Sequence, residues 1–182
     1  MKPASFNFPH LDALEDFLAA MARVPGELPG LSELDHALQC AHLIKIMAPT
    51  DEALQIAGLV HDIGQAIGHA KDHEYVAAKA ILPLLGPRIA ELVRLHVEAK
   101  RYLFATEPGY DISLSKISSA GLSFQGGAMN AAEIASFDDN PHSRDAICLR
   151  RCDDGAKIAG LIVPGLSVWL PILRRVAAAP SL

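Results

Sequence analysis

Apolar residues recur every three or four positions along most of the chain, which is the spacing of one face of an α-helix. The first such stretch carries apolar side chains at Leu11, Leu14, Phe17, Leu18 and Met21. A segment rich in proline and glycine over residues 25–30 then breaks the pattern and predicts a loop. The chain is therefore expected to open with an amphipathic helix and a turn.

The same pattern and its interruptions predict the helices that follow. Ser32 is a candidate N-cap for a helix that ends near Met47. Asp51 and Glu52 carry negative charge at the start of another helix, where the helix dipole favours it, and that helix ends near Gly64. Further helices are predicted over residues 73–86, 87–104, 131–138, 144–152 and 168–178.

Two segments depart from this helical pattern. Residues 107–130 are rich in glycine and serine and predict a loop with one short helix, whereas residues 155–165 resemble a strand. No repeat or linker divides the 182 residues. The prediction is a single all-α domain that spans residues 1–182.

Composition and charge narrow the class of protein. The net charge of −5 offers no basic field for nucleic acid, and the 51% hydrophobic content argues against disorder. The N-terminus has no basic region followed by an apolar run, and no apolar run approaches the roughly 18 residues of a membrane span. The three cysteines form no C-x-x-C pair and predict reduced thiols, with Cys40 and Cys148 in the core. We expect a soluble, cytoplasmic protein with no nucleic-acid or membrane partner.

The adjacent pair His61-Asp62 follows the apolar run 53–60 of a predicted helix. Burying a carboxylate there is costly unless its charge is compensated, and metal ions would compensate it. Further candidate ligands lie on other predicted helices, so they can converge only in a bundle core, where facing helices build dinuclear sites. These candidates are His36, His73, His96 and Asp153. Imidazole and carboxylate ligands suit iron, manganese, cobalt or zinc.

The remaining histidines have no comparable spacing. We expect them to be ordinary core or surface residues, and they are His10, His42, His69 and His142.

Two basic residues lie one helical turn from candidate ligands. Lys100 follows His96 by four positions and Arg150 precedes Asp153 by three, so each shares a helix face with a ligand. Together they predict a pocket for an anion with several oxygens, such as a phosphate or a phosphonate. Each also stands beside another arginine, so a solvated helix edge is the alternative.

The order of these residues, H…HD…H…H…D, resembles that of the HD-domain superfamily. Residues 34–41 (LDHALQCA), 96–103 (HVEAKRYL) and 124–129 (FQGGAM) are more specifically similar to PhnZ-type proteins. These are HD-domain mixed-valence di-iron oxygenases that cleave the carbon–phosphorus bond of 1-hydroxyalkylphosphonates, and they are related to myo-inositol oxygenase. The similarity covers roughly residues 30–165.

The resemblance implies an HD-domain helical bundle with a di-iron site in its core. One iron would take His36, His61, Asp62 and Asp153, and the other would share Asp62 and take His73 and His96. The implied reaction uses O2 as co-substrate and an Fe(II)/Fe(III) pair to convert a small organophosphonate into a carboxylate and inorganic phosphate. The implied substrate-binding residues are Lys100, Arg150, Ser118 and Gln125, and the implied catalytic residues are Asp62 and Lys100.

The chain departs from the family pattern at three positions. The family continues its HD pair as H-D-x-G-H, and its last histidine reaches the substrate, whereas this chain has Gln65 there. Glutamine can hydrogen-bond to a substrate but cannot deliver a proton at neutral pH. Gly26 and Pro29 stand where well-known members carry a tyrosine and a glutamate, although Glu27 is close by. We expect Gln65 to contact the substrate, and the sequence leaves open whether that substrate carries an amine.

Two other functions fit the HD pattern. The same two metals could activate water for hydrolysis of a phosphate ester. A non-catalytic module that binds a phosphonate or a phosphate is the second alternative. The strings at 96–103 and 124–129 favour the oxygenase, and the oligomeric state stays open.

Overall fold

The computed structural model describes residues 6–68 and 71–179. Over these residues it consists of helices and irregular segments, which confirms the predicted all-α class. In chain order the elements are α1 (Leu11–Ala20), the short 3-10 helix η1 (Met21–Arg23), α2 (Glu33–Met47), α3 (Glu52–Val60), α4 (Ile63–Ala66), α5 (His73–Thr106), α6 (Tyr110–Ser113), α7 (Lys116–Phe124), α8 (Ala131–Asp138), α9 (Ser143–Gly155) and α10 (Leu166–Ala178).

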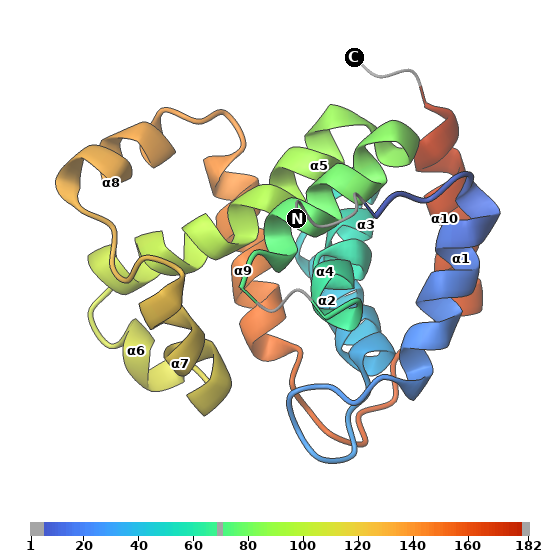
Figure 1. Cartoon of the computed structure of the whole chain (residues 1–182), viewed down its shortest axis with the longest axis horizontal. Coiled ribbons are helices and arrows are strands. Elements are labelled where there is room, and N and C mark those ends of the chain that lie inside the picture. Colours follow the sequence, from blue (N-terminus) through green and yellow to red (C-terminus); the bar gives the residue numbers. More distant parts are fainter. Residues whose placement is uncertain (1–5, 69–70, 180–182) are drawn as a thin grey trace.

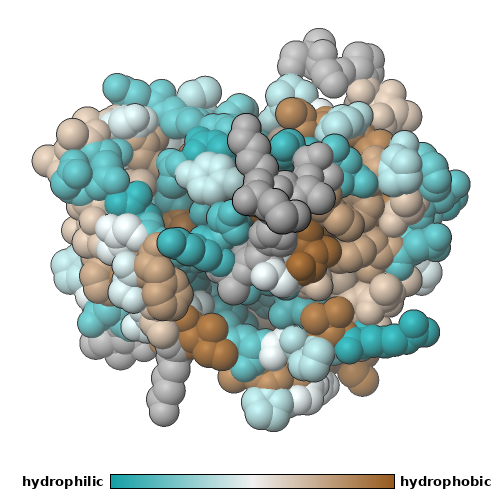
Figure 2. All heavy atoms as spheres, viewed as in Figure 1, coloured by the Kyte–Doolittle hydropathy of each residue, from teal (hydrophilic) through white to brown (hydrophobic). Residues whose placement is uncertain are grey.

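The helices pack around a shared apolar core. α2, α3, α5 and α9 contact one another at its centre, and α1 and α10 lie side by side along one edge (Figure 1). Fully buried side chains in this core include Leu59 of α3, Ile81 of α5 and Trp169 of α10. On the face seen in Figure 2, hydrophilic and hydrophobic residues are intermingled. The bundle thus encloses the point at which α2, α3, α5 and α9 meet.

Polar caps determine where α2 and α3 begin. The hydroxyl of Ser32 accepts a hydrogen bond from the backbone N–H of Asp35 at 3.1 Å, and the Asp35 carboxylate accepts one from the Ser32 N–H at 3.0 Å. This reciprocal pair satisfies backbone donors that the first helical turn leaves without partners. Asp51 similarly accepts from the N–H of Leu54 at 3.0 Å. Both predicted helix starts are confirmed.

A sharp kink divides α5 where two separate helices were predicted. Gly86 has φ 79° and ψ 174°, a conformation open to glycine, and Pro87 follows it. The half before the kink packs in the main core. The half after it begins in the main core, with Ile89 and Val93, and carries His96 and Lys100 further along. There it packs in a second apolar cluster, which consists of Leu95, Ala99, Met129, Phe137 and Ala146. The kink therefore lets one helix line both parts of the molecule.

The strand expected over residues 155–165 does not form, so that prediction was wrong. The segment after α9 is irregular, and its backbone bonds to side chains of α2 rather than to a neighbouring strand. Gln39 donates to the carbonyl oxygen of Ile158 at 2.8 Å and accepts from the Ile158 N–H at 3.1 Å. Residues 107–130 are also more helical than predicted, because they contain both α6 and α7.

The structure also bears on the cysteines and on membrane-spanning helices. Cys40 is buried as expected, whereas Cys148 is only partly buried and packs at the margin of the core, and Cys152 is buried as well. All three cysteines are free thiols. In the described part of the chain, no helix combines the length and the apolar character needed to cross a membrane.

Gly64 should be intolerant of a side chain. A Cβ there would lie 2.1 Å from the carbonyl oxygen of His73, so α4 and the start of α5 would have to move apart. We predict that Gly64→Ala lowers the free energy of unfolding by about 1–3 kcal/mol or more, as overpacking does. Gly165→Ala is the control, because a Cβ there meets nothing within 4 Å. Thermal unfolding of the two variants measures the difference, and equal midpoints would contradict the prediction.

Candidate metal centre

The six predicted ligands come from five segments and meet in the core. α2 contributes His36, the turn between α3 and α4 contributes His61 and Asp62, and α9 contributes Asp153. The remaining two, His73 and His96, come from the two halves of α5. All six residues are buried. Their polar atoms form two groups that could each hold a metal ion.

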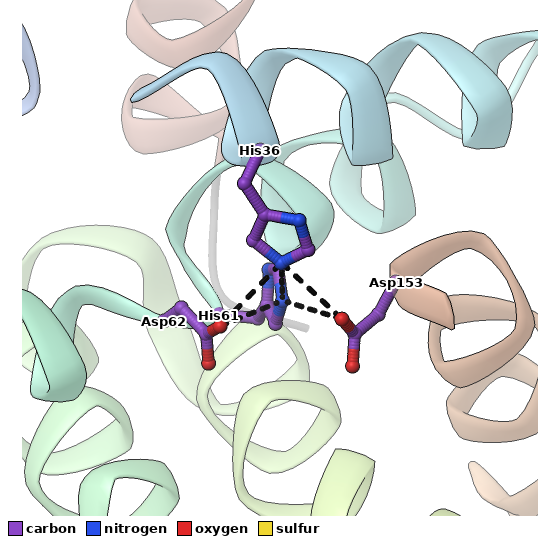
Figure 3. Close-up of side chains that lie close together, drawn as sticks. All are labelled: His36, His61, Asp62 and Asp153. Atoms are coloured by element: carbon purple, nitrogen blue, oxygen red, sulfur yellow. Dashed lines mark hydrogen bonds and ion pairs between the residues drawn. The ribbon is translucent and has the colours of Figure 1, made fainter. Parts of the chain in front are cut away.

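The first group consists of His36, His61, Asp62 and Asp153, which point toward one another in Figure 3. The Nε2 atom of His36 lies 3.3 Å from Nε2 of His61 and 3.2 Å from Oδ1 of Asp153. Oδ2 of Asp62 lies 3.5 Å from each of these two imidazole nitrogens. Ligands about 2.1 Å from one ion are separated by roughly 3.0–3.4 Å, so this spacing fits a metal ion.

The second group uses the other oxygen of the same aspartate. Oδ1 of Asp62 lies 3.3 Å from Nε2 of His73 and 3.7 Å from Nε2 of His96. The two imidazole nitrogens are 3.0 Å apart. Asp62 thus offers one oxygen to each group, which is the arrangement of a carboxylate that bridges two ions.

Hydrogen bonds to the backbone orient three of the imidazoles. Each ring places Nδ1 within hydrogen-bond distance of a carbonyl oxygen, so Nδ1 carries the proton and Nε2 is left as a lone pair. The pairs are His36 with Ala156 at 2.8 Å, His61 with Gly58 at 2.9 Å, and His96 with Val93 at 2.6 Å. Lone pairs of His36 and His61 that face each other at 3.3 Å repel unless a proton or a metal ion lies between them, and a bound metal ion would take the place of the proton. The donor set therefore fits a metal.

The electrostatics of the two groups favour charged carboxylates. Without a metal, burial alone would raise the pKa of Asp62, but His61 and His36 in their protonated forms hold that pKa well below its usual range. Arg150 and Lys157 likewise outweigh burial and keep the pKa of Asp153 low. Burial lowers the pKa of His96 well below its usual value, so this ring is neutral and can ligate.

A cavity of about 360 Å³ opens beside the second group of ligands. Asp62, His73, His96 and Asp153 line it, so a molecule in the cavity could reach the candidate metals. All five predicted substrate-binding residues also line this cavity, and they are Gln65, Lys100, Ser118, Gln125 and Arg150. The structure therefore places all five predicted residues in the wall of one cavity.

Lys100 is a buried cation in the wall of this cavity. Lys100 is only 3% exposed, and its Nζ lies 3.5 Å from the carbonyl oxygen of Ser118. Burial and the nearby charge of Arg150 lower the pKa of Lys100 to about 8. Such a lysine is desolvated and would gain from the arrival of an anion. Gln125 adds an Oε1 atom that is buried and has no hydrogen-bond partner in the described part of the chain.

Arg150 is more engaged with protein than the sequence suggested. Its Nη1 donates to Oδ2 of Asp153 at 2.6 Å, and its Nε donates to the Tyr110 hydroxyl at 3.1 Å and to Asp154 at 3.2 Å. Asp153 therefore presents one oxygen to His36 and receives a hydrogen bond at the other. Arg150 fixes a candidate ligand as well as lining the cavity, and its contact with a substrate stays a prediction.

Lys157 lines the same cavity and was not foreseen. Its Nζ lies 2.9 Å from Oε2 of Glu27, 2.9 Å from Oγ of Ser118 and 3.8 Å from Oδ1 of Asp153. The available signal was its position four residues after Asp153, which repeats the spacing of Lys100 from His96. The helix predicted over residues 144–152 ended before this position, so the spacing did not place Lys157 on a helix face.

The other histidines lie outside the two groups of ligands, as far as the structure describes them. Nδ1 of His10 accepts from the N–H of Ala13 and caps α1, and His142 precedes α9. His42 Nδ1 is buried and has no hydrogen-bond partner in the described residues. His69 lies outside the described residues.

The fold and the paired ligand groups define a helical protein built around a candidate dinuclear metal site. The sequence model of the HD domain matches residues 34–154, a range that includes all six candidate ligands. The chain belongs to the HD-domain family, within its PhnZ-type branch.

Two relatives support that branch. A hydroxymethylphosphonate dioxygenase of Gimesia maris is 42% identical over 150 residues, which cover 76% of this chain and 74% of the relative. The [1-hydroxy-2-(trimethylamino)ethyl]phosphonate dioxygenase (glycine-betaine-forming) of Leisingera caerulea is 33% identical over 151 residues, or 78% and 76% of the two chains.

Removal of the shared carboxylate should empty both positions. Asp62 contacts ligands of both groups, so we predict that Asp62→Ala abolishes tight binding of the roughly two ions per chain expected of the unaltered protein. Metal analysis after gel filtration measures this loss. Asp16→Ala, on an exposed position of α1, is the matched control and should keep its metal. Retention of two ions by Asp62→Ala would refute the bridging assignment.

Proposed function

We propose that this protein catalyses O2-dependent oxidative cleavage of the carbon–phosphorus bond of a small 1-hydroxyalkylphosphonate, giving a carboxylate and inorganic phosphate. The observation that carries the proposal is a pair of ligand groups that share Asp62 and border a cavity lined by buried cations. The names of the two relatives, both phosphonate dioxygenases, support the same reaction.

The proposed cofactor is a pair of iron ions in the Fe(II)/Fe(III) state. His36, His61, Asp62 and Asp153 would hold one ion, and Asp62, His73 and His96 would hold the other. Bound there, the pair would supply the redox chemistry with O2 and a Lewis acid for the substrate oxygens. Asp62 would act in catalysis by keeping the two ions adjacent.

The chain's own cations would bind and orient the phosphonate. Lys100 is the cation best able to turn toward a ligand, because Arg150 is engaged by Asp153 and Lys157 by Glu27. Contact with phosphonate oxygens would offset the desolvation of Lys100 and would strengthen as phosphate leaves, which makes Lys100 a proposed catalytic residue. Ser118, Gln125 and Gln65 would supply further hydrogen bonds from the cavity wall.

Oxygen consumption separates this proposal from hydrolysis. Given a 1-hydroxyalkylphosphonate in air, the iron-loaded protein should consume O2 and release phosphate in equal amounts, because both O2 atoms enter the two products. An oxygen electrode and a phosphate assay measure the ratio, with Asp62→Ala as the inactive control. Phosphate release that continues without O2, or that occurs only with phosphate esters, would favour a phosphohydrolase instead. Binding without turnover would favour a non-catalytic module.

Lys100 should set an alkaline limit on activity. Since its pKa is about 8, Lys100 is charged below that pH and loses its proton above it, so kcat/KM should fall as pH rises through about 8. Lys100→Arg should move this fall to higher pH, because guanidinium keeps its charge. Lys100→Ala should remove it and lower kcat/KM about ten- to a hundredfold, or about 1.5–3 kcal/mol, as loss of a charge-assisted hydrogen bond does.

The control for these variants is metal content, which should be unchanged because Lys100 contacts no candidate ligand by a hydrogen bond in the described residues. Near-full activity of Lys100→Ala would contradict the proposed contact between this lysine and the phosphonate. An identical pH profile for Lys100→Arg and the unaltered protein would also contradict its proposed charge.

A further inference from the structure

We propose that Tyr110 and Asp154 are positioning residues of the candidate metal centre. They hold the guanidinium of Arg150 in one orientation, and that guanidinium leaves Asp153 a single oxygen with which to bind an ion. The inference rests on the metal site of the proposed function but not on the identity of the substrate. Metal binding without a phosphonate therefore tests it separately.

The two oxygens of Asp153 have different partners. Oδ1 faces the first ligand group, 3.2 Å from Nε2 of His36 and 3.7 Å from Nε2 of His61, and Nζ of Lys157 is 3.8 Å away. Oδ2 instead accepts a hydrogen bond of 2.6 Å from Nη1 of Arg150. A carboxylate with both oxygens free could rotate or bind one ion through both of them. The hydrogen bond at Oδ2 commits Oδ1 to the ligand group, so the orientation of Arg150 decides how Asp153 binds.

Asp154 holds the other edge of the same guanidinium. Its Oδ2 lies 3.2 Å from Nε of Arg150, and its Oδ1 accepts a hydrogen bond from Nη2. Two parallel bonds to one carboxylate fix the plane of a guanidinium as well as its position. The third nitrogen, Nη1, is then left to meet Asp153. Arg150 thus joins two consecutive carboxylates of α9, and of these two Asp153 belongs to a candidate ligand group.

The hydroxyl of Tyr110 ties this arrangement to another helix. It accepts a hydrogen bond of 3.1 Å from Nε of Arg150 and donates one of 2.5 Å to Oδ2 of Asp154. Tyr110 is buried, and the side chain of Asp154 is only 14% exposed, so water competes weakly for these bonds. Tyr110 begins α6, whereas its two partners lie on α9 (Figure 1). Neither partner can turn without breaking a bond to a different segment of the chain.

Loss of iron to a coloured Fe(II) chelator tests the inference in protein loaded with Fe(II) under nitrogen. Asp154→Asn should weaken the binding of one of the two expected ions about ten- to a hundredfold, the usual effect of removing a partner behind a metal ligand. That ion is the one in the first group, because Asp153 belongs to the first group and not to the second. Release should therefore become biphasic. Tyr110→Phe removes one neutral hydrogen bond and should give the same pattern with a smaller effect, about two- to tenfold.

Double variants show whether the two residues act through Arg150. Arg150→Met leaves no guanidinium to hold, so adding Asp154→Asn to it should change the metal loss less than about twofold. Tyr102→Phe and Asp138→Asn are the matched controls, because these two residues form another tyrosine–aspartate pair, between α5 and α8. Both controls should release iron as the unaltered protein does.

The outcomes separate positioning from a purely structural role. Early release of one ion in Asp154→Asn supports the inference. Unchanged release overturns it, and so does simultaneous loss of both ions with a matching fall in unfolding temperature, because the residues then only stabilise the fold. Additive effects of Asp154→Asn and Arg150→Met would overturn the route through Arg150.

Two further results keep the test decisive. If Asp154→Asn does not fold, Tyr110→Phe decides, since early release of one ion is still expected from the loss of one hydroxyl. If Arg150→Met does not fold, Arg150→Gln replaces it, because glutamine also lacks the fork. Failure of the unaltered protein to bind two ions would overturn the inference. Biphasic release in a protein that oxidises no 1-hydroxyalkylphosphonate would support the inference and refute the proposed function.

Discussion

The shared carboxylate of Asp62 is the constraint on which the rest of the site depends. Its two oxygens face two groups of imidazoles that come from α2, the turn after α3, and both halves of α5. The backbone must turn at His61-Asp62 to aim both side chains inward, which explains why α3 ends at Val60 and a short α4 follows. Gly64 then allows α4 to touch the backbone of His73. Both the local turn after α3 and the packing of α4 on α5 therefore fix the position of the Asp62 carboxylate.

Charged groups of opposite sign surround the two buried carboxylates, Asp62 and Asp153. Two carboxylates and several lone pairs converge at the centre, and each carboxylate is paired with cations or imidazoles because an unpaired buried charge is strongly destabilising. Arg150 holds Asp153 from behind and is itself neutralised by Asp154. Lys100 has no such carboxylate partner among the described hydrogen bonds, and its lowered pKa reflects that difference. The cation with the least compensation borders the cavity that a ligand would enter.

The sequence predicted the helical class, most helix boundaries and the residues that meet at the centre. It could do so because apolar periodicity, the Ser32 cap and an adjacent histidine–aspartate pair are local signals. It failed for residues 155–165. There the backbone of Ile158 bonds to the side chain of Gln39, which is 119 positions away in the sequence. It missed Lys157 for the same reason, since Glu27 and Ser118 are brought to it by tertiary packing. Contacts that an irregular segment makes with residues far away along the chain leave no periodic trace in a sequence.

The same division separates the candidate metal ligands from the ion pair of Glu27 and Lys157. The candidate ligands sit on helices or at helix ends, where capping and core packing fix their positions. Glu27 and Lys157 sit in irregular segments, before α2 and after α9. Loops tolerate substitution better than packed helices, so these two positions are less constrained by packing than the candidate ligands are.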